Sequence, residues 1–119
     1  MEQHNTITLY RPVNQVELDL IEQSGWKKFP PRLPEQPIFY PVMNEAYAIQ
    51  ITREWNVPAY GIGYVTAFEV EKDYLQQFKI ENVGAEMHHE LWVPAEELAT
   101  FNSKIIGPIQ VIQTYTEND

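Results

Sequence analysis

Nine prolines divide this chain of 119 residues into short segments, and they limit the strands and helices it can form. Proline lacks a backbone N–H and fixes φ, so it ends a central strand and is accepted in the first turn of a helix. Pro12 therefore predicts that a first strand ends near Arg11, and Pro41 ends a second strand. The spacing predicts a domain built from short elements.

Strands are indicated by short runs rich in β-branched and aromatic residues, several of them alternating between polar and apolar. The clearest of these runs covers residues 64–70. In a strand, alternate residues share one face, and these are Tyr64, Thr66, Phe68 and Val70. We predict strands over 6–10, 38–40, 64–70, 79–83, 89–93 and 109–115.

The first helix has both a start and a stop signal. Asn14 is a typical N-cap residue, and Glu17 three positions later completes a capping box. Gly25 supplies the left-handed residue that commonly follows a helix.

Later helices are predicted over 45–55, capped by Asn44, over 72–78, and over 95–102 with Pro94 in the first turn. We expect Ala46, Ile49 and Trp55 on the inner face of the helix over 45–55. Strands and helices do not alternate regularly, which argues against a Rossmann domain. The fold class is α+β, with about five or six strands and two or three helices.

A proline-rich loop over 26–37 joins the first helix to the second strand. It is long for a compact domain, and long ordered loops are often functional. Trp26 and Phe29 could form a lid over a cleft or a plug inside the core, and we favour the plug.

The length predicts a single domain over 1–119, with a frayed acidic tail over 116–119. There is no cysteine, which excludes disulfides and thiolate metal sites. Neither a signal peptide nor a membrane-spanning stretch is evident, so we expect a cytoplasmic protein.

The formal net charge of −9 disfavours nucleic acid and anionic membrane surfaces as partners. Half of the eight cationic residues nevertheless lie in the first 32 positions: Arg11, Lys27, Lys28 and Arg32. They form either a local patch that binds a small anion or a solvated surface.

Several sequence runs together resemble one family over about residues 8–111. They are Leu9-Tyr10-Arg11-Pro12-Val13, Ser24-Gly25-Trp26, Phe29-Pro30-Pro31-Arg32, Gln36-Pro37-Ile38-Phe39-Tyr40-Pro41-Val42 and Glu90-Leu91-Trp92-Val93-Pro94-Ala95-Glu96-Glu97-Leu98. The chain resembles the small bacterial proteins labelled ADP-ribosylation/crystallin-J and, more widely, the ADP-ribosyltransferase-like fold. The resemblance implies a small, split antiparallel sheet.

The resemblance also implies an NAD cleft, with NAD as a substrate. Arg11 would hold the ribose or phosphate, and Tyr40 would stack on nicotinamide. Tyr47 follows Ala46 in the small-then-aromatic pattern of the same motif. Glu90 would be the catalytic residue that binds a ribose hydroxyl and stabilises the oxocarbenium-like transition state.

Two further residues join the expected cofactor-binding set. Arg32 belongs to the basic patch, and His88 lies two residues before Glu90, where arginine-directed transferases carry Glu or Gln. His88 and Glu90 lack an evident third ligand, so we expect no metal site.

Each of the three central residues also has a structural interpretation. Arg11 could pair with a nearby carboxylate, and Tyr40 could be a core aromatic. Glu90 shares one strand face with Trp92, while Leu91 and Val93 share the other, which we expect to face the core. On an open face, Glu90 would be an ordinary surface acid.

Two functions remain open. The first is an ADP-ribosyltransferase or NAD glycohydrolase, whose partner is a nucleotide or a protein acceptor. The second is a non-catalytic nucleotide- or protein-binding module on the same scaffold. The protein would be a monomer or a homodimer, and we expect Arg11, Tyr40 and Glu90 to line one cleft.

Overall fold

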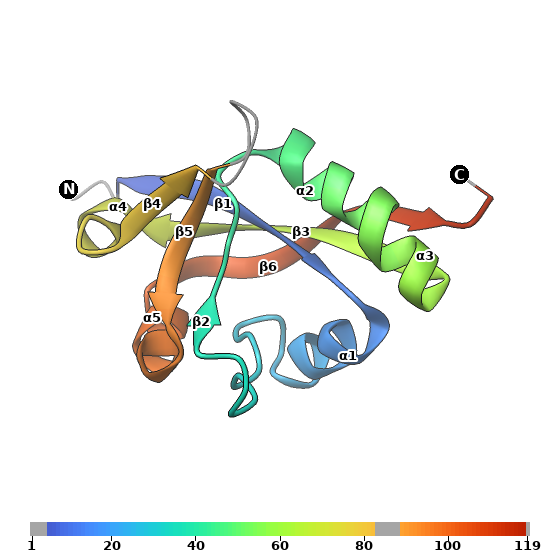
Figure 1. The fold of residues 1–119 in the computed structure, drawn as a ribbon. Coiled ribbons are helices and arrows are strands. Elements are labelled where there is room, and N and C mark those ends of the chain that lie inside the picture. The colour runs from blue at the N-terminus through green and yellow to red at the C-terminus, as the bar shows by residue number, and fades with distance from the viewer. Residues whose placement is uncertain (1–4, 83–88, 119) are drawn as a thin grey trace.

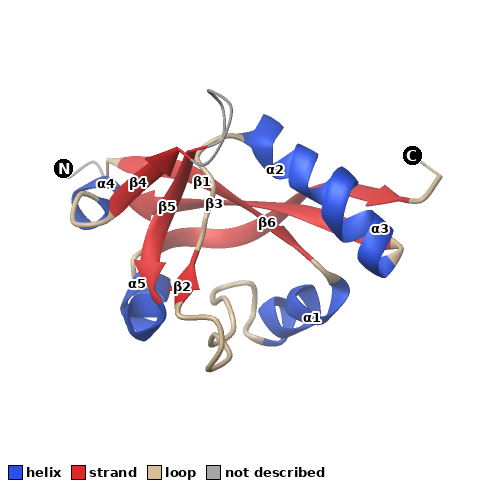
Figure 2. Ribbon diagram, in the orientation of Figure 1, coloured by secondary structure: helices blue, strands red, loops and turns tan. Residues whose placement is uncertain are grey.

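The computed structural model describes residues 5–82 and 89–118, and it is an α+β protein (Figures 1 and 2). Its strands are β1 (Thr6–Val13), β2 (Ile38–Phe39), β3 (Ile62–Glu71), β4 (Lys79–Asn82), β5 (His89–Pro94) and β6 (Ile105–Thr116). Its helices are α1 (Gln15–Gln23), α2 (Glu45–Ile51), α3 (Val57–Tyr60), α4 (Lys72–Leu75) and α5 (Leu98–Ser103). A π-helical segment, η1 (Thr52–Asn56), and a 3-10 segment, η2 (Ala95–Glu97), complete the set. Within the described residues there are five α-helices, more than the two or three expected.

The strands form two antiparallel sheets of three, in the orders β1-β3-β6 and β2-β5-β4. Val42 joins the two sheets, because its backbone bridges Tyr10 of β1 on one side and Glu90 of β5 on the other. The Val42 N–H donates to the Tyr10 carbonyl at 2.8 Å, and the Tyr10 N–H donates to the Val42 carbonyl at 3.0 Å. Past this point the two halves diverge (Figure 1).

Two predicted strand limits are wrong. Pro12 lies inside β1, opposite Val65, and Pro108 lies inside β6, which begins at Ile105 and not at 109. Both strands lie at an edge of the β1-β3-β6 sheet, where a missing N–H need not interrupt a ladder. Gly107, at φ 80°, accompanies a register shift beside Pro108. Thr116, placed in the frayed tail by the sequence, is the last residue of β6.

The N-cap predicted for the first helix is confirmed. The Asn14 side chain accepts a hydrogen bond from the Glu17 N–H at 2.9 Å. The Glu17 carboxylate, which a capping box would turn back toward Asn14, binds Arg11. Gly25 follows the end of α1 at φ 78°, as predicted.

The second helical region runs further than expected. Asn44 caps it by accepting from the Tyr47 N–H at 2.7 Å. The helix then continues through η1 and α3 to Tyr60, beyond the predicted end at position 55, and stops at Gly61, at φ 82°.

The predicted inner face of this helix is right for Ile49, which is partly buried against the smaller core cluster, and wrong for Ala46 and Trp55, which are exposed. Besides Tyr47, the buried positions are Ala48, Thr52 and Val57. Ala48 and Thr52 are four residues apart, whereas Thr52 and Val57 are five residues apart. A π-helical turn accounts for the longer step, because it inserts one residue and rotates the following side chains.

Two clusters of buried side chains lie on opposite faces of the β1-β3-β6 sheet, where Figure 1 shows α1 on one side and α2 on the other. The larger joins α1, the proline-rich loop and the β2-β5-β4 sheet: Leu9, Val13, Leu18, Ile21, Phe29, Phe39, Phe68, Val70, Leu75, Leu91, Val93, Leu98, Phe101 and Ile109. The smaller joins α2 to the sheet through Val42, Tyr47, Ala48 and Val65.

No helix among residues 5–82 and 89–118 is long and apolar enough to cross a membrane.

Candidate functional site

Arg11 is buried in β1 and bound to a carboxylate. It is 9% exposed and shares a strand face with the core residues Leu9 and Val13. Its Nε donates to Glu17 Oε2 at 2.6 Å, and its Nη2 donates to Glu17 Oε1 at 3.0 Å. The guanidinium carbon also lies 4.7 Å from the centre of the Phe39 ring. The pairing with a nearby carboxylate is therefore the interpretation that the structure supports for Arg11.

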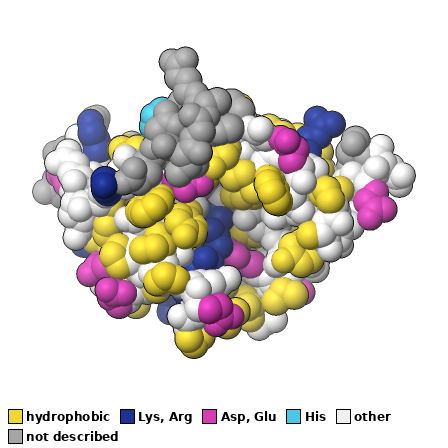
Figure 3. All heavy atoms as spheres, in the orientation of Figure 1, with side chains coloured by type: hydrophobic (Ala, Val, Ile, Leu, Met, Phe, Trp, Pro, Cys, Tyr) yellow, Lys and Arg dark blue, Asp and Glu magenta, His cyan; other side chains and the backbone are white. Residues whose placement is uncertain are grey.

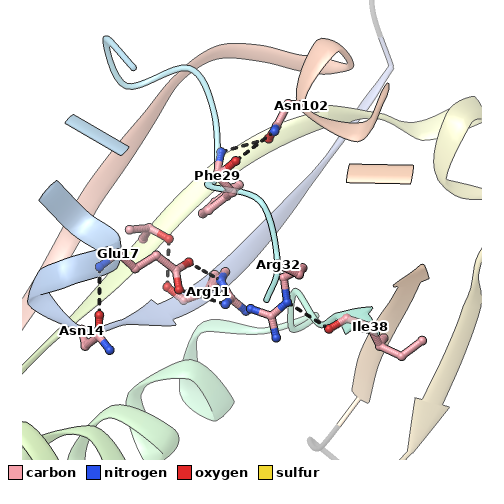
Figure 4. A network of polar contacts seen from close by, with 8 residues as sticks. Arg11, Asn14, Glu17, Phe29, Arg32, Ile38 and Asn102 are labelled. Carbon is pink, nitrogen blue, oxygen red and sulfur yellow. Dashed lines mark hydrogen bonds and ion pairs between the residues drawn. The ribbon is translucent and has the colours of Figure 1, made fainter. Parts of the chain in front are cut away.

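Arg32 lies beside this ion pair (Figure 4). Its Nε donates to the Ile38 carbonyl at 3.2 Å. Burial lowers the pKa of Arg32, and the positive charge of Arg11 lowers it further. Both guanidinium groups feel the charge of Glu17, and among the described residues Glu17 forms its ion pair with Arg11 and not with Arg32.

Glu90 is held in place by two donors. The Tyr47 hydroxyl, from α2, donates to Glu90 Oε2 at 2.7 Å, and Trp92 Nε1 lies 3.3 Å from Glu90 Oε1. Burial raises the pKa of the Tyr47 hydroxyl, and the hydrogen bond to Glu90 and the charge of that group raise it further. Tyr47 therefore stays a hydrogen-bond donor over the whole physiological pH range.

Tyr40 lies at the surface, directly after β2. Its side chain is 37% exposed, so it is not a buried core aromatic. It meets Trp92 edge to face, with 5.9 Å between the ring centres. Arg32 is held near the start of the same strand, where its Nε donates to the Ile38 carbonyl. Figure 3 shows basic side chains next to hydrophobic ones near the middle of this face.

The structure does not place all the predicted site residues together. Tyr10, Val42 and Glu90 are opposite one another and share a sheet face, to which Tyr40 also belongs by alternation. Arg11 follows Tyr10 and so projects from the opposite face. Two groups of residues result, one on each side of the segment 38–42.

Two contributors were missed from the sequence. Glu17 had been assigned to a capping box, and its role as partner of Arg11 depends on how α1 folds back on β1. Trp92 had been placed on the face of Glu90 by alternation, and this signal predicted the neighbourhood but not the hydrogen bond.

His88, predicted to bind the cofactor, lies outside the described residues. Among the residues that are described, no three His, Cys, Asp or Glu side chains gather as metal ligands would.

The proline-rich loop contributes to the core, which confirms the plug interpretation. Phe29 is 2% exposed, and its ring lies 4.8 Å from that of Phe68 and 5.2 Å from that of Phe39. Asn102 holds the loop on α5, because its side-chain amide accepts from the Phe29 N–H at 3.0 Å and donates to the Phe29 carbonyl at 3.1 Å (Figure 4). The loop thereby fixes the position of Arg32 next to β2.

Comparisons with known proteins do not narrow the choice of ligand. No model of a known protein family matches the chain, and no curated protein matches its sequence.

Proposed function

We propose that the protein binds NAD or ADP-ribose over β2 and β5 and acts at the nicotinamide ribose. One observation carries this proposal. The ring of Tyr40 meets Trp92, which hydrogen-bonds to the Glu90 carboxylate, and the cation Arg32 is held at Ile38, two residues before Tyr40 in the chain. A dinucleotide offers a partner for each of these groups.

The cation suits the pyrophosphate. A guanidinium binds phosphate oxygens through two parallel hydrogen bonds, and a bound anion would offset the repulsion between Arg32 and Arg11. Because Glu17 already occupies Arg11, the phosphate contact is assigned to Arg32. Arg11 becomes a positioning residue that holds Glu17 and the Phe39 ring beside it.

The carboxylate suits the ribose. Cleavage breaks the bond between the ribose C1′ and the nicotinamide nitrogen, and the bonding electrons leave with nicotinamide. Positive charge then develops on the ribose, and Glu90 would stabilise it before water or an acceptor forms the new bond to C1′. Tyr47 and Trp92 fix Glu90 in advance, which is the condition for effective electrostatic stabilisation.

The scaffold also favours this proposal. Two antiparallel three-stranded sheets meet at Val42, as expected for the split sheet of an ADP-ribosyltransferase-like domain. Scaffold alone does not define activity, so the residues around Tyr40 are the ones to test.

The test is calorimetric titration with NAD and with ADP-ribose, followed by an assay for released nicotinamide. Arg32→Gln should weaken both ligands by about tenfold or more, which corresponds to the loss of a charge-assisted contact. Glu90→Gln should keep binding and abolish nicotinamide release. Arg53→Gln is the matched control, because Arg53 lies over Tyr115 at a different place. Equal binding by the Arg32 and Arg53 variants would contradict the proposal.

A non-catalytic interaction module is the second candidate. Large apolar side chains are exposed on the outer side of the helices: Val16 is 69% exposed, Leu20 44% and Trp55 71%. Val16 and Leu20 are one helical turn apart on α1 and so share a face. Sedimentation of the protein and of its Leu20→Ser variant tests this candidate. Concentration-dependent association that the variant loses would favour it.

A further inference from the structure

A groove lies between the proline-rich loop and α5, away from Tyr40 and Glu90. It has a volume of about 870 Å³, and its walls come from the loop residues around Phe29, from η2 and α5, and from the first residues of β6. The groove does not include Arg32, Tyr40 or Glu90. Phe29 lines the groove and packs against Phe39, whose ring contacts the Arg11 guanidinium.

The walls of the groove are mostly apolar. Pro31 and Phe29 line the loop side, Leu98 and Ala99 the α5 side, and Ile105 the β6 side. A volume of this size lies within the range of small-molecule sites, which are concave and lined mainly by apolar groups.

Two left-handed turns border the groove. Gly25 and Trp26 have φ values of 78° and 65° at one end, and Gly107 has a φ of 80° at the other. The Ile109 N–H donates to the Trp26 carbonyl at 2.7 Å and ties the two turns together. A tryptophan at positive φ is strained, and such strain persists where the surrounding structure fixes it.

Two lysines lie at the rim of this groove. Lys27 and Lys28 line it with exposed side chains, and Glu96 is the acid among its lining residues. Within the part of the chain that the structure describes, neither lysine forms an ion pair. In a protein of net charge −9, the groove thus has a basic rim beside an apolar interior.

We propose that this groove binds an amphipathic carboxylate, a small molecule with an aliphatic body and one anionic end. The aliphatic body would lie against Leu98, Ala99 and Ile105, and the carboxylate would lie at Lys27 and Lys28. Charge complementarity selects this occupant, because an uncharged apolar molecule leaves both ammonium groups unpaired and a cation is repelled by them. This site is separate from the proposed nucleotide site and does not depend on it.

The test is calorimetric titration with decanoate and with decanol, which share the aliphatic body and differ in the charged end. Decanoate should bind with a stoichiometry of one, and more tightly than decanol. The double variant Lys27→Ala, Lys28→Ala should weaken decanoate binding by about 2–10-fold, as expected for exposed charge pairs, and leave decanol unchanged. Raising the salt concentration should reduce the advantage of decanoate.

Two further variants make the test decisive. Ala99→Trp fills the groove from an exposed position on α5, so it should abolish binding of both molecules without unfolding the protein, which circular dichroism would check. Lys72→Ala removes an exposed lysine outside the groove and should change nothing. The proposal is overturned if decanoate does not bind in a saturable way, if the lysine pair makes no difference, or if Ala99→Trp still binds.

Discussion

The hydroxyl of Tyr47, on α2, donates a hydrogen bond to the carboxylate of Glu90, on β5, across 2.7 Å. This contact joins a helix on one half of the molecule to a strand of the other half, next to the point where Val42 bridges the two sheets. It therefore bears on both the stability of the fold and the position of Glu90.

Tyr47→Phe should lower the free energy of unfolding by about 1.5–3 kcal/mol, because it removes a hydrogen bond to a charged group in a part-buried place. Urea unfolding measures the change. Trp92→Phe should cost less, since the bond from its indole is longer, at 3.3 Å. A double-mutant cycle of Tyr47→Phe with Glu90→Gln should show strong coupling. Additive effects in the cycle would mean that the hydrogen bond contributes nothing.

Glu17→Gln should destabilise the protein by about 1.5–3 kcal/mol, because it leaves the guanidinium groups of Arg11 and Arg32 without their carboxylate. Glu22→Gln, at an exposed position in the last turn of the same helix, is the control and should stay within about 0.5 kcal/mol of the parent protein. Thermal unfolding of the three proteins side by side gives the comparison. Equal values for the two variants would mean that the buried pair has no net effect.

Strand positions were predictable from the sequence because apolar and polar residues alternate along a strand that buries one face. Leu91 and Val93 are buried and Trp92 is half exposed, as alternation predicts. Pro12 misled the prediction of the end of β1, because the effect of a proline depends on whether the strand is at an edge. Whether a strand lies at an edge depends on how the whole sheet is assembled, and the local sequence does not determine it.

The helix after Asn44 shows a different limit. Its N-cap was predictable, since an N-cap is a local interaction. Its inner face was predictable only in part, because the π-helical turn rotates the side chains that follow Thr52. Trp55 is consequently exposed, although a regular helix would have allowed it to face the core.

The candidate site was predictable in part for a related reason. The sequence indicated Arg11, Tyr40, Tyr47 and Glu90 as separate positions. It did not indicate that Glu17 occupies Arg11, because that depends on a long-range fold of α1 against β1. The number and order of charged residues in the sequence do not show which carboxylate forms an ion pair with which arginine or lysine.

Stability at high pH should depend on Tyr74. Burial, followed by the hydrogen bond to Glu97 and its charge, raises the pKa of Tyr74 from 10.0 to about 12. Unfolding therefore releases a proton between these pH values, so this contribution to stability is complete below pH 10.0 and is lost as the pH rises toward about 12.

Tyr74→Phe should accordingly make the free energy of unfolding fall less steeply with pH in that range. Glu97→Gln should give an intermediate slope, because it removes one of the causes of the shift and leaves burial in place. Urea unfolding at a series of alkaline pH values measures these slopes. Identical slopes for the parent protein and Tyr74→Phe would contradict the assignment.

Gly63, in β3, leaves room for the helix that follows Asn44. A Cβ at this position would lie 2.6 Å from Thr52 Cγ2 and 3.1 Å from Asn56 Cβ. Gly63→Ala should therefore destabilise the protein by about 1–3 kcal/mol through overpacking. Thr52→Ser removes the nearer methyl group and keeps the hydroxyl that donates to the Ala48 carbonyl at 2.8 Å.

The double variant Gly63→Ala, Thr52→Ser should consequently be more stable than the sum of the two single changes predicts, because the serine relieves the clash that the alanine creates. The double variant should still be less stable than the parent protein, because the alanine Cβ would remain close to Asn56 Cβ. Gly25→Ala is a useful contrast, since no atom lies within 4 Å of its Cβ position and its φ of 78° is the cause of any loss there. Thr52→Ser should not rescue Gly25→Ala, and a rescue of both would show that the serine stabilises the helix by some other route.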